Sequence, residues 1–186
     1  FTHEWPEIVH PIDLIKQRRP DLTVIIGGEH ATAMAEFCLS TSKADIVVLG
    51  EGEETIVELV DALEAGRSLA EIDGLAFHDR DHERIIVNKR RMRMTEIDSL
   101  APPAWDLFDL KIYHDHRYEG CMHSASLSVP ILATRGCPYQ CTYCSSANMW
   151  TLRWIPRDPI KVVNEIEGYM RKYGAGNFPL QDLTAI

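Results

Sequence analysis

The sequence predicts an α/β protein made of more than one part. Short apolar strands alternate with helices over residues 1–66, a more polar stretch with paired prolines follows over 67–125, and a strand, loop, helix and strand pattern returns over 126–186. Short β-branched strands between helices are typical of a parallel sheet that is buried on both faces. We therefore expect three regions with boundaries at these positions.

The first region contains three expected helices and two expected strands. Pro20 ends the first helix, because proline cannot continue one, and each strand stops at a glycine, Gly27 or Gly50. Apolar residues recur at helical spacing in the last helix, and Gly66 follows its end. In order, we expect a helix over 8–19, a strand over 23–26, a helix over 31–39, a strand over 45–49 and a helix over 53–65.

The second region is predicted to begin with a β-hairpin. Two short apolar runs, 74–77 and 84–87, flank the polar turn 79–83. Pro102 and Pro103 then make 100–105 an extended linker, since paired prolines cannot lie inside a helix. This linker is the expected boundary before the last region.

The third region reads as the start of a second α/β series. The apolar run 127–133 predicts a buried strand, and 177–182 predicts the next one. Between them, Asp158 is a good N-cap for a helix that has Pro159 at its first position and Gly174 after its end. The expected apolar stripe of this helix is Ile160, Val163, Ile166 and Met170. Neither α/β series has enough strands to close a sheet or barrel, so we expect a fragment of a longer protein.

Composition excludes several functional classes. The net charge of −9 argues against a nucleic-acid partner, and the one basic cluster, 89–93, is interpreted as a solvated face. No apolar run approaches the roughly 20 residues of a membrane span. Three of the five cysteines are bunched together, which is a poor disulfide framework. This usage suits a reducing compartment, and we expect a cytoplasmic protein without a membrane partner.

The bunched cysteines are the most informative feature of the chain. Cys137, Cys141 and Cys144 are spaced C-x3-C-x2-C directly after the apolar run 127–133. Three thiolates on one loop can hold three irons of a [4Fe–4S] cluster and leave the fourth iron open to a substrate or cofactor. Electron-transfer clusters and structural zinc sites normally take four protein ligands. The alternatives are a partial zinc site and cysteines that share a loop by chance.

The segment 135–145, Arg-Gly-Cys-Pro-Tyr-Gln-Cys-Thr-Tyr-Cys-Ser, resembles the cluster motif of the radical S-adenosylmethionine superfamily. The resemblance implies that Cys137, Cys141 and Cys144 ligate the cluster and that S-adenosylmethionine chelates the open iron. It also implies that Tyr143 packs beside the adenine. The loop would then follow the first strand of a (β/α) barrel, where chemistry sits at the carboxyl ends of the strands.

Three further residues of the last region are candidates for contacts with a cofactor or substrate. Asp182, at the end of the second expected strand, falls where the superfamily often contacts the amino or ribose groups of S-adenosylmethionine. Arg153 and Arg157 follow the cysteine loop and can meet a carboxylate, but a solvated or salt-bridged arginine is the preferred interpretation.

Two glycine loops in the first region each follow an expected strand and precede an expected helix. Glycines there let the backbone approach a ligand in the crevice beyond the carboxyl ends of the strands, although such a pair is also found in simple tight turns. The absence of G-x-G-x-x-G counts against a dinucleotide. The candidate cofactor-binding residues of these loops are Gly27, Gly28, Glu29, His30, Gly50, Glu51 and Gly52.

Together with the cysteine motif, these loops resemble the second half of the cobalamin-binding domain that precedes many radical S-adenosylmethionine barrels. The resemblance implies a partial Rossmann-like cobalamin-binding domain over 1–66, a connector with a hairpin over 67–125 and the N-terminal part of a radical barrel over 126–186. It places the loops against the corrin and its nucleotide tail. For His30, a structural histidine is preferred over a cobalt ligand.

The implied function is that of a cobalamin-dependent radical enzyme. Its cluster would reductively cleave S-adenosylmethionine to a 5′-deoxyadenosyl radical, and methyl transfer to an unactivated centre is the favoured outcome. The alternatives are a radical rearrangement or cyclisation with the same cofactors, and a non-catalytic iron–sulfur module. The expected partners are a small-molecule or peptide substrate and an electron donor such as flavodoxin or ferredoxin. The fragment by itself is expected to be inactive, and no catalytic residue is assigned.

Overall fold

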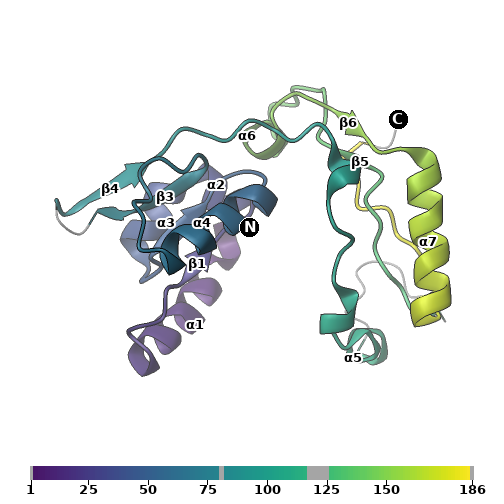
Figure 1. The fold of residues 1–186 in the computed structure, drawn as a ribbon, viewed down its shortest axis with the longest axis horizontal. Helices are drawn as coiled ribbons and strands as arrows, with labels where there is room; N and C mark the ends of the chain where they lie inside the picture. Colours follow the sequence, from purple (N-terminus) through teal and green to yellow (C-terminus); the bar gives the residue numbers. More distant parts are fainter. Residues whose placement is uncertain (1, 80–81, 117–125, 185–186) are drawn as a thin grey trace. The chain divides into compact units, whose positions relative to one another are not determined.

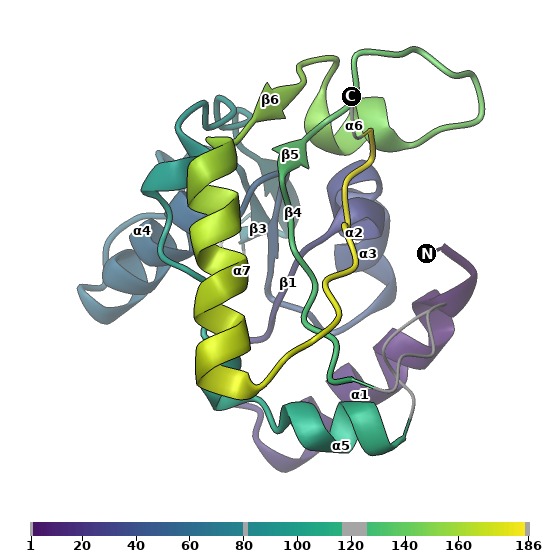
Figure 2. The same ribbon diagram turned by 90° about the vertical axis from the view of Figure 1, so that its right-hand side faces the viewer.

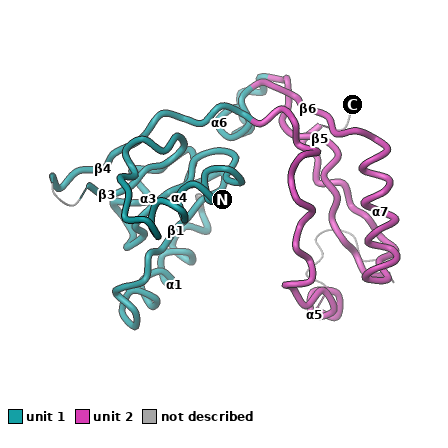
Figure 3. Tube along the Cα trace, viewed as in Figure 1, with its two compact units in different colours: residues 1–93, 140–151 teal, residues 94–139, 152–186 magenta. Residues whose placement is uncertain are grey.

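A computed structural model describes residues 2–79, 82–116 and 126–184 of the chain (Figure 1). The chain divides into two compact units (Figure 3). Unit 1 comprises residues 1–93 together with 140–151, and unit 2 comprises residues 94–139 together with 152–186. The second half of the cysteine loop therefore belongs to unit 1.

Unit 1 is built on a four-stranded sheet in the order β1 (Ile25–Ile26), β2 (Ile46–Val48), β3 (Leu75–Asp79) and β4 (Arg84–Val87). β1 and β2 are parallel, whereas β2–β3 and β3–β4 are antiparallel. The expected hairpin is confirmed, and so is the parallel pairing of the two strands of the first region, β1 and β2. The hairpin, which was assigned to the connector, adds two antiparallel strands and makes the sheet mixed. The hairpin begins with two fully buried apolar residues, Leu75 and Ala76, and these pair with β2 and extend the same sheet.

Both faces of this sheet are covered, as the apolar strands predicted. Val47 packs into a cluster with residues of α1 and α3, while its neighbours Ile46 and Val48 pack against Leu59 of α4 on the other face. The expected helix over 31–39 is two helices, because the chain breaks at Met34, where φ is −131°. The helices of unit 1 are η1 (Thr2–Glu4), α1 (Trp5–Arg18), α2 (Glu29–Ala33), α3 (Ala35–Thr41), α4 (Glu53–Glu64) and α6 (Ser146–Trp150).

Unit 2 contains the expected strand–helix–strand unit, with α7 (Pro159–Tyr173) as its crossover (Figures 1 and 2). The segments 127–131 and 177–181 run parallel: the Val129 N–H donates to the Asn177 carbonyl at 3.0 Å and the Gln181 N–H to the Ile131 carbonyl at 2.9 Å. Pro130 and Pro179 have no N–H, so the pairing is reduced to isolated bridges. The expected strands are thus adjacent but irregular.

The ends of α7 are as predicted, but its buried face is not. The Asp158 carboxylate accepts from the Ile160 N–H at 2.8 Å, and Gly174 has a φ of +67° after the last turn. The expected stripe is mostly exposed, with Ile160 at 68% and Met170 at 51%. The face of the helix that packs into the core is an adjacent one, which shares Ile166 with the expected stripe. It consists of Val162, Ile166, Tyr169 and Tyr173.

The remaining elements of unit 2 are short. β5 (Thr134–Arg135) and β6 (Ile155–Pro156) pair antiparallel and close the base of the cysteine loop, which the sequence did not indicate. The helices are η2 (Ile97–Ser99), η3 (Trp105–Leu107) and α5 (Leu110–Asp115). Within the described residues, no helix is long and apolar enough to cross a membrane. The region boundaries at residues 66 and 125 stay a prediction, although the hairpin assigned to the connector shares the sheet of unit 1.

Candidate cofactor site

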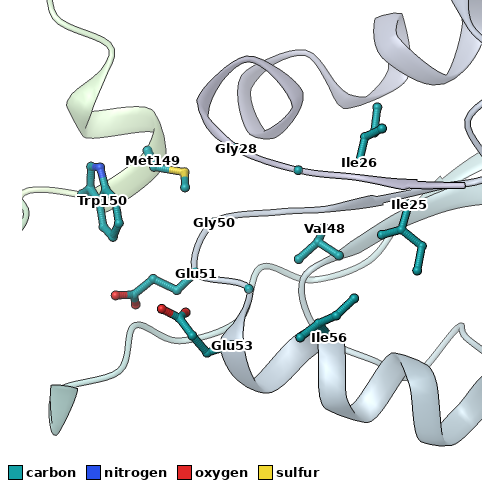
Figure 4. A pocket seen from close by; sticks show the side chains of 12 residues that line it. Ile25, Ile26, Gly28, Val48, Gly50, Glu51, Glu53, Ile56, Met149 and Trp150 are labelled. Atoms are coloured by element: carbon teal, nitrogen blue, oxygen red, sulfur yellow. The ribbon is translucent and has the colours of Figure 1, made fainter. Parts of the chain in front are cut away.

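A crevice of about 490 Å³ lies in unit 1 where β1 and β2 end (Figure 4). Two short loops follow these strands, and α6 supplies further lining residues beside them. Figure 4 shows Met149 and Trp150 of α6 next to the loops that carry Gly28 and Gly50. The lining residues are Ile25, Ile26, Gly27, Gly28, Val48, Gly50, Glu51, Gly52, Glu53, Ile56, Met149 and Trp150.

The glycines of the two loops are required by the local geometry. Gly28 has a φ of +95° and Gly50 a φ of +72°, a backbone region that favours glycine. A Cβ on Gly27 would meet the Val48 carbonyl oxygen at 3.3 Å, and one on Gly52 would meet Val48 Cγ1 at 3.3 Å. These positions let the backbone itself form the wall of the crevice.

Thr32 connects the second glycine loop to α6. Its hydroxyl oxygen accepts from the Gly50 N–H at 3.0 Å, and the hydroxyl lies 3.5 Å from Met149 Sδ. A single side chain of α2 therefore contacts both the second glycine loop and the segment that follows the cysteines. Nothing in the sequence pattern marked Thr32 for this role.

Five of the seven predicted residues of the glycine loops line the crevice, and the remaining two contact other parts of unit 1. The His30 ring packs beside Trp5 and Phe37, with centroids 5.2 and 6.3 Å away, and burial lowers the pKa of its imidazole. The Glu29 carboxylate accepts from the Ser145 hydroxyl at 3.3 Å. Their roles toward a cofactor stay predictions.

The basic cluster 89–93 is not the solvated face that was expected. Arg90 donates to the Met149 carbonyl, and Arg91 donates to the hydroxyl of Thr55 at 2.7 Å and to a carboxylate of α4. Arg93 pairs with Glu51 at 3.3 Å, and these two side chains are only 7% and 9% exposed. The sequence shows only a run of basic residues, because the carbonyls and carboxylates that bind these arginines come from distant segments.

The three clustered cysteines stay a prediction as metal ligands. Cys137 is partly exposed, Cys141 and Cys144 are exposed, and all three are free thiols. The Cys144 N–H donates to the Cys141 carbonyl at 3.1 Å. In the described part of the chain, no three His, Cys, Asp or Glu side chains are gathered into a metal-binding group. Tyr143 is 91% exposed, and its place beside an adenine is likewise untested.

The end of the second strand of unit 2 lies beside the first cysteine. The Asp182 carboxylate accepts from the Ala133 N–H at 3.2 Å and from the Thr134 hydroxyl, so it holds the two strand ends together. The Thr184 hydroxyl donates to Cys137 Sγ at 3.0 Å. Sequence reasoning missed Thr184, although the parallel pairing of 127–131 with 177–181 would have placed it near the cysteine.

Arg157 has the structural role that was preferred for it. Its guanidinium donates to Asp98 at 2.9 Å and to the Leu132 carbonyl at 2.9 Å, and it pairs with Glu165 at 2.6 Å. Burial acts to lower the pKa of Arg157, but these hydrogen bonds and charges outweigh it and raise the pKa. It ties the connector to α7 and does not line the crevice.

The sequence is similar to known proteins over nearly its whole length. Residues 1–60 match the family model of the B12 binding domain. The chain is 33% identical over 186 residues to the anaerobic magnesium-protoporphyrin IX monomethyl ester cyclase of Synechocystis sp., covering 97% of this chain and 35% of that protein. It is 27% identical to the cytidylyl-2-hydroxyethylphosphonate methyltransferase of Streptomyces wedmorensis, over 98% of this chain and 38% of that one.

The fold is shared with a solved structure. The radical S-adenosylmethionine methyltransferase TsrM from Kitasatospora setae, with cobalamin and a [4Fe–4S] cluster bound, superimposes with a TM-score of 0.71 at 21% identity, over 97% of this chain and 34% of TsrM. The chain spans about a third of the length of each of these proteins. Residues 1–60 therefore belong to the B12 binding domain family, and the similarity to these longer proteins runs on through the cysteine motif.

Proposed function

We propose that this chain forms part of a cobalamin-dependent radical enzyme that cleaves S-adenosylmethionine and methylates an unactivated carbon or phosphorus centre. The observation that carries the proposal is the make-up of the crevice. Its lining combines the glycine loops with Met149 and Trp150, which follow Cys144 by only five and six positions. A cofactor in the crevice would therefore contact the chain next to the cysteine loop.

The chemistry of the crevice suits a corrinoid. Its lining is mainly backbone of glycine loops and the apolar side chains Ile25, Val48 and Ile56, which can lie flat against a large ring. A volume of about 490 Å³ is ordinary for a ligand pocket and would take part of so large a cofactor. The carboxylate of Glu51 is already paired with Arg93, so it adds little net charge to the wall.

The cysteine loop would hold the second cofactor. Cys137, Cys141 and Cys144 would ligate the [4Fe–4S] cluster, which when bound supplies the electron that breaks a carbon–sulfur bond of S-adenosylmethionine, giving methionine and a 5′-deoxyadenosyl radical. The chain's own contribution is to present the thiolates. The Thr184 hydroxyl would donate to the Cys137 sulfur, and Asp182 would keep the adjoining strand ends in place.

The test is product analysis with the full-length protein under anaerobic conditions. The protein is loaded with iron, sulfide and cobalamin, reduced, and given S-adenosylmethionine. We expect 5′-deoxyadenosine and S-adenosylhomocysteine, and we expect no 5′-deoxyadenosine from the Cys144→Ser variant. A loaded, reduced protein that leaves S-adenosylmethionine intact would instead indicate a non-catalytic iron–sulfur module.

Cyclisation is the second candidate, and the observation that favours it is the 33% identity to a protein named as a cyclase. The cofactors would be the same, but no methyl group would be transferred. The two candidates separate on one product. Formation of 5′-deoxyadenosine without S-adenosylhomocysteine would support cyclisation or rearrangement over methylation.

The remaining partners are part of the same proposal. The cluster requires a one-electron donor, for which a flavodoxin or ferredoxin is suited, and a small-molecule or peptide substrate. Exposed free thiols at Cys141 and Cys144 suit a reducing compartment, so we propose the cytoplasm. Reduction of the loaded cluster by a purified flavodoxin, followed by electron paramagnetic resonance, tests the donor.

A further inference from the structure

Two residues that line the crevice, Met149 and Trp150, belong to a helix that is too short to be stable by itself. α6 (Ser146–Trp150) has five residues and no side-chain cap, and the residue that follows it, Thr151, has a φ of +58°. Isolated helices of this length have little stability in water. The position of Met149 and Trp150 must therefore be set by contacts from elsewhere in unit 1.

Arg93 makes one of these contacts, and its side chain is only 7% exposed. Its guanidinium donates to the Trp150 carbonyl at 2.5 Å and stacks over the Trp150 ring, with the central carbon 5.4 Å from the ring centroid. The same group pairs with Glu51 on the second glycine loop, where both side chains are more than nine-tenths buried. One planar cation thus connects the two sides of the crevice lining.

The contacts depend on the shape of arginine and not only on its charge. A guanidinium has donors on three nitrogens and a flat face, so it can serve a carbonyl, a carboxylate and an indole ring together. A lysine ammonium at the same position can keep the charge beside Glu51, but it cannot donate in the same fork and stack on Trp150.

We infer that Arg93 is a positioning residue for the proposed cobalamin crevice, holding Trp150 and Glu51 in the arrangement that receives the cofactor. The inference rests on the proposed function and names a residue that carries out one part of it. Arg93 does not line the crevice itself. Its effect on the cofactor passes through the two lining residues that it contacts.

The test uses the full-length protein and hydroxocobalamin as the probe. Arg93→Lys is compared with Arg91→Lys, a matched control in the same cluster whose partners are Thr55, Glu54 and Glu58 of α4, none of which lines the crevice. Affinity is measured by titration of the visible absorption, and hydrogen exchange is followed at the amides of 145–150. Arg93→Met provides a second variant that removes the charge as well.

We expect Arg93→Lys to weaken hydroxocobalamin binding about tenfold, as the loss of a charged hydrogen bond would, and to speed exchange at 145–150 while exchange in β2 is unchanged. Arg91→Lys should bind like the unmodified protein. Equal affinity in Arg93→Lys and the unmodified protein would overturn the inference, as would faster exchange spread evenly over unit 1. Failure of the unmodified protein to bind hydroxocobalamin would instead remove the proposed function.

Discussion

Removal of the Arg157 guanidinium tests the account of unit 2. Three acceptors surround it, Asp98, Glu165 and the Leu132 carbonyl, and the exposed fractions of the three charged side chains are 13–16%. Breaking a buried ion pair by removing one partner costs about 3–5 kcal/mol. Asp98 keeps the Asp158 N–H as a donor and Glu165 keeps the Tyr169 hydroxyl, so we take the lower end, about 3 kcal/mol.

The assay is hydrogen exchange at the α7 amides of the full-length protein, which reports the local free energy of opening. At about 1.4 kcal/mol for each factor of ten, Arg157→Met should speed exchange at α7 about a hundredfold. Arg171→Met is the matched control, because its pair with Glu167 is 70% and 56% exposed and such pairs contribute little. Equal exchange rates in the two variants would show that the Arg157 contacts do not stabilise α7.

Four further predictions concern single residues. Gly50→Ala and Gly66→Ala both place a side chain at positive φ, +72° and +62°, so each should lower the free energy of unfolding by about 1 kcal/mol. Only Gly50→Ala should weaken hydroxocobalamin binding in a titration. Leu59→Ala, at a fully buried site, should lower the free energy of unfolding by about 2–5 kcal/mol in urea, and a smaller loss would contradict the core assignment. Burial acts to raise the pKa of Asp98, but hydrogen bonds from the Asp158 N–H and Arg157 outweigh it and lower the pKa below 3.8. The stability that the Asp98 carboxylate contributes should therefore be present above pH 3.8 and be lost as the pH falls through the lowered pKa. Asp98→Asn should remove this pH dependence from the free energy of unfolding. Cys144→Ser should abolish the reconstituted cluster's electron paramagnetic resonance signal, which Ser145→Ala should keep, and a full signal in Cys144→Ser would remove that thiol from the ligand set.

Local signals in the sequence predicted the ends of elements well. Pro20 follows the first helix, Asp158 caps α7 and Gly174 ends it. Each of these residues acts on the backbone within a few positions of itself. The hairpin was predicted for the same reason. Such signals need no knowledge of distant segments, and most of the helices and strands were accordingly found.

Features set by distant partners were not predicted. The apolar start of the hairpin pairs with β2, which makes the sheet mixed, and α7 turns a different stripe toward the core. Arg93 reads as one charge in a basic run until Glu51 and the Trp150 carbonyl are seen beside it. The crevice glycines were predicted because a strand that ends in glycine is a local pattern, whereas Trp150 is held at the crevice by contacts with distant segments.

In the proposed site, one cofactor crevice combines the glycine loops with the segment that follows the cysteines. The decisive measurement is hydrogen exchange of the full-length protein with and without hydroxocobalamin. We expect added protection in three segments far apart in the sequence, 27–30, 50–53 and 145–150, and none at β4, the edge strand of the sheet. Tight binding that leaves all three segments unprotected would contradict this site.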